Sequence, residues 1–116
     1  MENTKLPFQI GEQYENWEFE LEILPDRING YDSYKYIGNE FKFFLNYLPD
    51  ETELIFNLDI LECVLFVFKN RDKQFYKKVK LDLKTNYDIF CKIKGDKVFI
   101  AYGNIGLIQG SFNIFF

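Results

Sequence analysis

Apolar and polar residues alternate with a period of two over several stretches of this chain. In one stretch Trp17, Phe19, Leu21 and Ile23 alternate with Glu18, Glu20 and Glu22. Because successive side chains of an extended strand point to opposite faces, the pattern predicts strands with one face in the core. Only one alanine occurs among 116 residues, whereas Phe and Tyr are abundant, which also favours β structure over helix.

The alternation and the turn signals predict strands over residues 14–24, 31–37, 40–48, 75–84 and 108–116. A hairpin over 87–94 and 97–102, with Gly95-Asp96 as its turn, pairs Ile93 with Val98, Cys91 with Ile100 and Ile89 with Tyr102. Residues 50–68 are ambiguous, because leucines at helical spacing compete with alternation. We therefore expect a single mainly β domain over 1–116, an antiparallel sheet, sandwich or barrel of about eight or nine strands. A short helix near 51–61, in an α+β fold, is the alternative.

Two cysteines and the absence of a leader sequence bear on location. Cys63 and Cys91 both lie within apolar alternation, which predicts buried, reduced thiols in the cytosol, with an interstrand disulfide as the alternative. Residues 1–15 lack the apolar region of a signal peptide, and no apolar run is long enough to span a bilayer. We expect a cytoplasmic protein that does not enter a membrane.

The charges are divided unequally along the chain. Residues 1–62 contain fourteen acidic and four basic residues, whereas residues 63–116 contain four acidic and ten basic residues, within an overall net charge of −4. This asymmetry predicts either pairing between the two halves or a surface that meets a charged partner.

The residue types needed for most catalysis are missing. The chain has no histidine, which removes the commonest general base and the commonest zinc ligand. No glycine-rich stretch precedes a helix pattern as a phosphate-binding loop does, and Asp26 to Asp32 lacks the spacing of a calcium loop. We expect no enzyme activity, no cofactor and no metal.

The glutamate row Glu18, Glu20 and Glu22 has two interpretations. It could form a cross-strand charge ladder with Lys78, Lys80 and Lys84, or with Lys92 and Lys94. It could instead be an acidic surface that attracts a basic protein. The predicted partner-binding residues are listed together: Glu18, Glu20, Glu22, Asp26 and Asp32 as charges, with Trp17, Tyr34 and Tyr36 as apolar anchors. The alternation also assigns Trp17 to the core.

In size, acidity and lack of catalytic residues the chain is similar in general character to small bacterial immunity proteins, which block a toxin by binding it. No residue motif carries this similarity. It implies a non-catalytic inhibitor that occludes the active cleft of a basic, nuclease-like toxin with its acidic surface.

The alternative is a small β-barrel that binds an apolar ligand or single-stranded nucleic acid. Bases and aromatics mix between Phe75 and Phe99, as on a single-stranded nucleic-acid platform, but the overall acidity opposes phosphate binding. Nucleic acid is therefore the weaker expectation.

Overall fold

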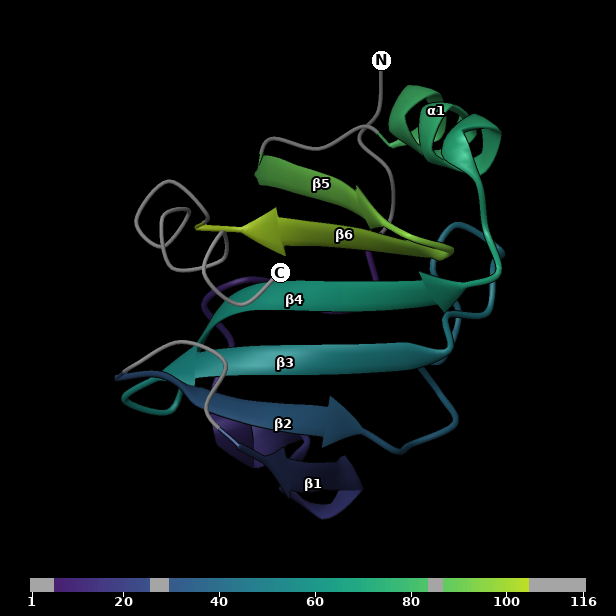
Figure 1. Ribbon diagram of the computed structural model, residues 1–116. Coiled ribbons are helices and arrows are strands. Elements are labelled where there is room, and N and C mark those ends of the chain that lie inside the picture. Colours follow the sequence, from purple (N-terminus) through teal and green to yellow (C-terminus); the bar gives the residue numbers. More distant parts are fainter. Residues whose placement is uncertain (1–5, 26–29, 84–86, 105–116) are drawn as a thin grey trace.

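The computed structural model describes residues 6–25, 30–83 and 87–104 of the chain. The elements are listed in chain order: the 3-10 helices η1 (Tyr14–Asn16) and η2 (Glu18–Glu20), then β1 (Leu21–Leu24), β2 (Asp32–Tyr36), β3 (Glu51–Asn57), β4 (Ile60–Lys69), α1 (Lys73–Asp82), β5 (Asp88–Lys94) and β6 (Lys97–Gly103). The strands form one antiparallel sheet in the order β1-β2-β3-β4-β6-β5 (Figure 1).

The sheet is open, with β1 and β5 as its edges in the part of the chain that the structure describes. The mainly β class is confirmed, whereas a sandwich or barrel of about eight or nine strands was wrong. Three predicted stretches, 14–20, 40–48 and 75–84, do not form regular strands in this sheet, and 108–116 lies outside the described residues. An open sheet encloses no lumen, so the barrel on which the apolar-ligand alternative depended is absent from the described fold.

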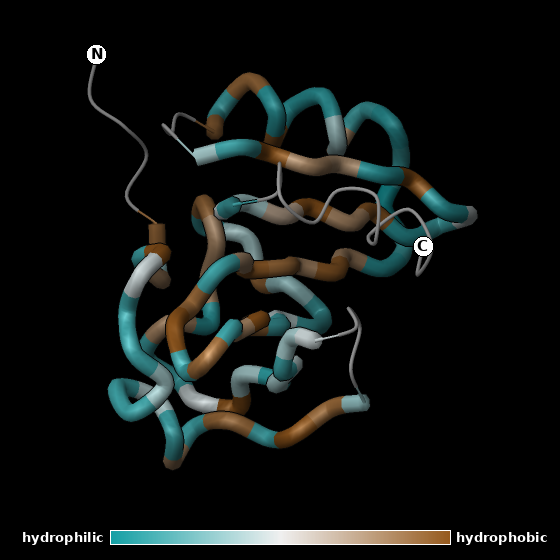
Figure 2. Tube along the Cα trace, turned by 90° about the vertical axis from the view of Figure 1, so that its left-hand side faces the viewer, coloured by the Kyte–Doolittle hydropathy of each residue, from teal (hydrophilic) through white to brown (hydrophobic). Residues whose placement is uncertain are grey.

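The two faces of the sheet bury different amounts of apolar surface. The larger core lies on one face, where Phe66, Ile100 and Tyr102 pack against Phe8 and Trp17 of the N-terminal segment and Val79 of α1. The opposite face carries a smaller buried cluster that includes Ile55, Cys63, Leu65, Val67 and Ala101. Figure 2 shows hydrophobic residues along strands in the middle and at the edges of the sheet.

The N-terminal segment is fixed to the sheet through Tyr102. Its buried hydroxyl donates to the Phe8 carbonyl oxygen at 2.6 Å and accepts from the Phe8 amide at 3.2 Å. The Phe8 ring then makes edge contacts with Trp17 and Tyr36, with ring centroids 5.5 and 5.1 Å apart. The buried Phe8 therefore connects β6 and β2 with the turn that precedes β1.

Helix α1 replaces the strand predicted over 75–84. Asp72 caps it, because its side-chain oxygen accepts from the amides of Gln74 and Phe75 at 3.1 Å each. Phe75, Tyr76, Val79 and Leu83 pack on the core with helical spacing, whereas Leu81, which the alternation predicted to be buried, is exposed. Val79 and Leu83 fit both periods, whereas Leu81 fits only the period of two, and the cap together with packing selects the helix.

The region 40–48 is a loop closed by a tight turn. The amides of Phe44 and Tyr47 each donate to the other's carbonyl oxygen at 2.8 Å, around Leu45 and Asn46 at positive φ. Phe44 is completely buried and stacks on Phe66, with ring centroids 4.2 Å apart. Phe44, together with the partly buried Phe41, Leu45 and Tyr47, covers the sheet where the sequence predicted a strand.

The strands after residue 50 follow the sequence more closely. Residues 51–57 and 60–69 are paired strands, so the helix near 51–61 does not form. The β5–β6 register is the predicted one, with Ile93 opposite Val98, Cys91 opposite Ile100 and Ile89 opposite Tyr102. Cys63 and Cys91 are free thiols in the clusters of opposite faces, so the interstrand disulfide is absent.

Candidate functional site

The three glutamates do not form one row. Glu18 and Glu20 lie in η2, and only Glu22 lies in the strand β1. A 3-10 helix turns every three residues, so it breaks the period of two on which the predicted row depended. Asp26 lies outside the described residues, and Asp32 is exposed at the start of β2.

Glu20 turns inward and binds Tyr36. The Tyr36 hydroxyl donates to Glu20 Oε2 at 2.7 Å and accepts from the Phe41 amide at 3.2 Å. Burial, followed by the hydrogen bond to Glu20, raises the pKa of Tyr36 to about 12. This pair packs directly over Gly38, where a Cβ atom would collide with Glu20 Oε2 and the Tyr36 hydroxyl. Glu20 therefore has a structural partner within the chain.

The aromatic anchors predicted for a partner lie mostly inside the molecule. Trp17 and Tyr36 are each only 6% exposed. Tyr34 is half-buried against Tyr14 and Phe56, with ring centroids 5.1 and 5.7 Å apart, and burial raises its pKa. A rigid partner could reach Tyr34 only in part, and the buried rings of Trp17 and Tyr36 serve the core.

Two other apolar side chains are exposed at the β1 edge. Phe19 is 91% exposed and Ile23 is 77% exposed, beside exposed Glu18 and Glu22. We call these four residues the β1 edge surface. It lies at the end of the sheet far from α1 (Figures 1 and 2). Sequence reasoning missed Phe19, which the alternation assigned to the core with Trp17.

A sequence signal for this arrangement exists in retrospect. Tyr14 and Trp17, three residues apart, both contact Phe56, with ring centroids 5.7 and 6.4 Å away. Spacing of three is that of a 3-10 helix, and it turns Phe19 outward when Trp17 turns inward. Only the contact with Phe56, some forty residues away along the chain, shows which period applies.

Of the three glutamates, only Glu22 lies opposite a lysine in the strand register, and that lysine is Lys35, which the sequence analysis did not predict. Glu22 lies opposite Lys35 in the β1–β2 register, and Lys35 lies opposite Glu53 in β3. The lysines of α1 and β5 lie at the other end of the sheet, and Lys84 is outside the described residues. Glu18 in η2 has no register position on this ladder.

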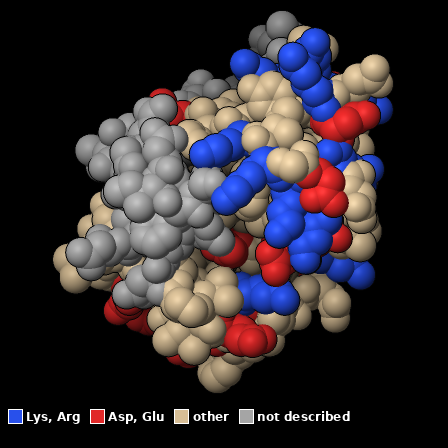
Figure 3. Space-filling model, in the orientation of Figure 1, with Lys and Arg blue, Asp and Glu red and all other residues tan. Residues whose placement is uncertain are grey.

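Basic side chains gather at the opposite end of the same sheet. Lys97 lies opposite Lys69 of β4 and opposite Lys94 of β5, so three exposed lysines follow one another across three strands. On the same face, the next cross-strand pair places Lys92 of β5 opposite Phe99 of β6. Figure 3 shows Lys and Arg side chains gathered over this part of the sheet. We call Lys69, Lys92, Lys94 and Lys97 the lysine rows.

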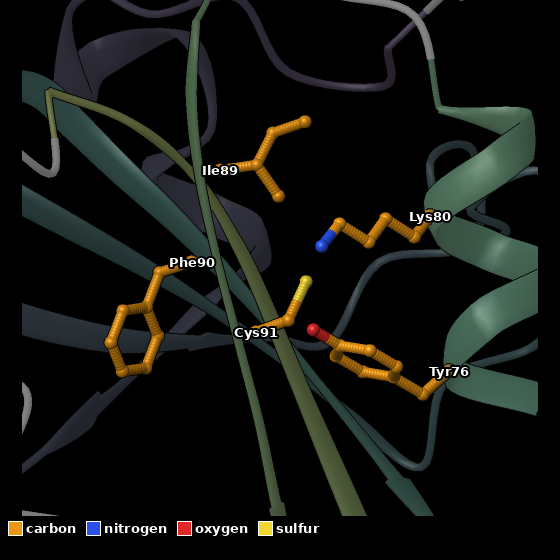
Figure 4. A pocket seen from close by; sticks show the side chains of 5 residues that line it. All are labelled: Tyr76, Lys80, Ile89, Phe90 and Cys91. Atoms are coloured by element: carbon orange, nitrogen blue, oxygen red, sulfur yellow. The ribbon is translucent and has the colours of Figure 1, made fainter. Parts of the chain in front are cut away.

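A pocket of about 310 Å³ separates α1 from β5 (Figure 4). Lys80 and Tyr76 of α1 point toward Cys91 and Ile89 of β5, whereas Phe90 points away from them. Burial raises the pKa of the Cys91 thiol to about 11, although the Lys80 charge opposes this shift. The Cys91 thiol is therefore protonated at neutral pH and is not an activated nucleophile.

Comparison of the chain with protein-family models, with curated proteins and with solved structures finds no match. Within residues 6–25, 30–83 and 87–104, no three His, Cys, Asp or Glu side chains are grouped to hold a metal ion. No helix in that part of the chain is long and apolar enough to cross a membrane. The geometry and charge of these surfaces therefore carry the functional assignment.

Proposed function

We propose that this chain is a non-catalytic protein-binding domain whose β1 edge surface holds a basic partner. The observation that carries the proposal is the exposure of Phe19 and Ile23 at the β1 edge, each next to an exposed glutamate, Glu18 or Glu22. Burying one such apolar side chain at an interface contributes about 1.5–3 kcal/mol, and the flanking carboxylates favour a cationic partner. Apolar anchors with a charged rim are typical of binding sites that combine affinity with fast association.

The role that fits this surface best is an immunity-type inhibitor of a basic, nuclease-like toxin. Inhibition by occlusion requires a surface and no reactive group, which is consistent with a chain that has no histidine. Carboxylates at the β1 edge would meet the cations that line a nuclease cleft, while Phe19 and Ile23 exclude water from the contact. The expected place of action is the cytoplasm, and the complex needs no cofactor.

The test uses the product of the gene adjacent to the one that encodes this chain. Its basic domain is purified, its nuclease activity is measured, and the chain is titrated into it. The proposal expects loss of activity at a 1:1 ratio and association that slows as salt rises from about 50 to about 500 mM. A basic nuclease domain that keeps full activity with excess chain contradicts it.

Matched variants assign the effect to the surface. Phe19→Ala is expected to weaken inhibition about tenfold, whereas Leu81→Ala, which truncates an exposed apolar residue of α1, has no effect. Glu22→Lys is expected to slow association about tenfold, and Asp96→Lys, the same change of charge in the β5–β6 turn, serves as its control. Equal effects within each pair would contradict the assignment.

A second candidate function, single-stranded nucleic-acid binding, is favoured by the lysine rows. Like charges that lie opposite each other across strands repel, so Lys69, Lys97 and Lys94 together destabilise the sheet unless an anion lies over them. Phe99 offers a half-buried ring on the same face. The test is fluorescence anisotropy with labelled oligo-dT at low salt. Binding that Lys94→Gln plus Lys97→Gln abolishes supports this candidate, and no binding at about 50 mM salt contradicts it.

A further inference from the structure

The backbone of β1 presents hydrogen-bonding groups on its outer side. The Ile37 amide donates to the Glu20 carbonyl oxygen at 2.8 Å, and the register continues with Glu22 opposite Lys35. In an antiparallel pair the bonded positions alternate, so Glu20, Glu22 and Leu24 direct their backbone groups toward β2. Leu21 and Ile23 therefore direct their N–H and C=O groups to the outer edge.

Among the described strands, β1 pairs with β2 alone, so this outer edge has no strand beside it. An edge of this kind is a template for another strand unless the protein protects it. The protection here is partial, because β1 is only four residues long and the exposed Pro25, which has no N–H group, follows it. Two amides and two carbonyl oxygens remain, enough for one short strand.

The charges of β1 disfavour a second copy of the chain as that strand. Antiparallel pairing centred on Glu22 would place this residue opposite its own copy, and pairing centred on Leu21 would place it opposite Glu20. Pairing centred on Ile23 would set Leu21 opposite Pro25, which donates no bond. Each register therefore brings two carboxylates together or loses a hydrogen bond.

A basic partner satisfies the same edge. We propose that the β1 edge binds an extended segment of a basic partner protein, which adds a seventh strand beside Leu21–Leu24. The segment has a Lys or Arg opposite Glu22, on the face that also carries Lys35, and apolar residues on either side of it. Those apolar residues lie on the other face, beside Leu21 and the exposed Ile23. This inference rests on the proposed function and specifies how its partner is held.

The decisive variant is Ile23→Pro, which removes one outward N–H group without touching the bonds from β1 to β2. Ile23→Ala is its control, because it removes the side chain and keeps the N–H group. Glu22→Pro tests which backbone N–H groups point toward β2. The N–H group of Glu22 is expected to face β2, so its loss should lower Tm by about 5–10 °C. The Tm of the Ile23→Pro variant should lie within about 2 °C of that of the Ile23→Ala variant, because both variants keep the hydrogen bonds between β1 and β2.

The binding probe is a blocked eight-residue peptide in which valine and lysine alternate, added to the isotopically labelled chain and followed by NMR and amide exchange. At saturation, exchange at Leu21 and Ile23 should slow about fivefold or more. A peptide in which valine and glutamate alternate should leave that exchange unchanged. Ile23→Pro should weaken the lysine peptide about fivefold more than Ile23→Ala does.

The outcomes separate this inference from the proposed function, which the nuclease assay tests independently. Equal binding of the peptide by the Pro and Ala variants, or binding that leaves exchange at Leu21 and Ile23 unchanged, overturns strand addition even if the nuclease is inhibited. Dimerisation of the chain that Ile23→Pro abolishes also overturns it, because the edge would then bind a second copy. Slowed exchange with the lysine peptide supports strand addition even if the nuclease stays active.

Discussion

Replacing Tyr36 by Phe removes one hydroxyl that holds three parts of the chain together. This hydroxyl donates to Glu20 in η2 at 2.7 Å and accepts from the Phe41 amide in the following loop at 3.2 Å, while its own ring lies in β2. A bond to a carboxylate contributes about 1.5–3 kcal/mol, and an amide that loses its partner costs about 1 kcal/mol. Because Glu20 is only half-buried, we take the lower values and expect a loss of about 2–3 kcal/mol.

That loss is large enough to measure by urea or thermal unfolding. For a chain of this length, 1 kcal/mol corresponds to about 4 °C, so Tyr36→Phe should lower Tm by about 8–12 °C. Glu20→Gln keeps an acceptor oxygen and loses only its charge, so it should cost about half as much. The double variant should then be less destabilised than the sum of the two, because both changes remove the same bond.

The same bond predicts a dependence on alkaline pH. In an unfolded chain the pKa of tyrosine is about 10. In the folded protein, burial and the hydrogen bond to Glu20 raise the pKa of Tyr36 to about 12. The folded state therefore binds this proton more tightly, and the stabilisation is complete below about pH 10 and is lost as pH rises toward about 12. Tyr36→Phe should remove this part of the alkaline decline. A cost below about 0.5 kcal/mol, or a decline that Tyr36→Phe leaves unchanged, would refute the structural role of the pair.

Three further predictions concern other sites. Tyr102→Phe leaves the buried N–H and C=O groups of Phe8 without their partner, and should lower the free energy of unfolding by about 2–4 kcal/mol in urea titrations. Gly38→Ala should destabilise the chain about as much as Tyr36→Phe, and adding Tyr36→Phe to it should cost little more, because both disrupt the same pair. Cys91, whose pKa burial raises to about 11, should react with iodoacetamide at pH 8 about 100-fold more slowly than a free thiol, and faster as pH rises.

The sequence predicted those parts of the fold that residues close together in the chain determine. The β5–β6 hairpin has a two-residue turn at Gly95-Asp96, and such a turn sets the register of every pair that follows. The unequal charges also have a spatial counterpart, because β1, β2 and β3 from the acidic half are neighbours in the sheet. Strand formation and charge division follow from residues close together in sequence.

The candidate site could be predicted only in part. Glu18, Glu22 and Asp32 are exposed, as a binding surface requires, but Glu20 and Tyr36 bind each other and Trp17 is buried. Phe19, the most exposed of the large hydrophobic residues in the described part of the chain, was assigned to the core. The outward position of Phe19 and the inward position of Glu20 share one cause, which is the 3-10 turn at Glu18–Glu20, whereas the burial of Trp17 agrees with the alternation.

Three features follow from the order of residues alone, because each depends on residues that are neighbours in the chain: the β-rich class, the pairing of the last hairpin and the separation of acidic from basic residues. Which aromatic side chains face inward was decided by the tertiary structure. A period of two places alternate residues on opposite faces only if the backbone is extended. Around Trp17 the backbone turns instead, because the ring of Phe8 and the ring of Phe56, which is distant in sequence, offer Trp17 a buried position, and Phe19 is left exposed to solvent as a consequence.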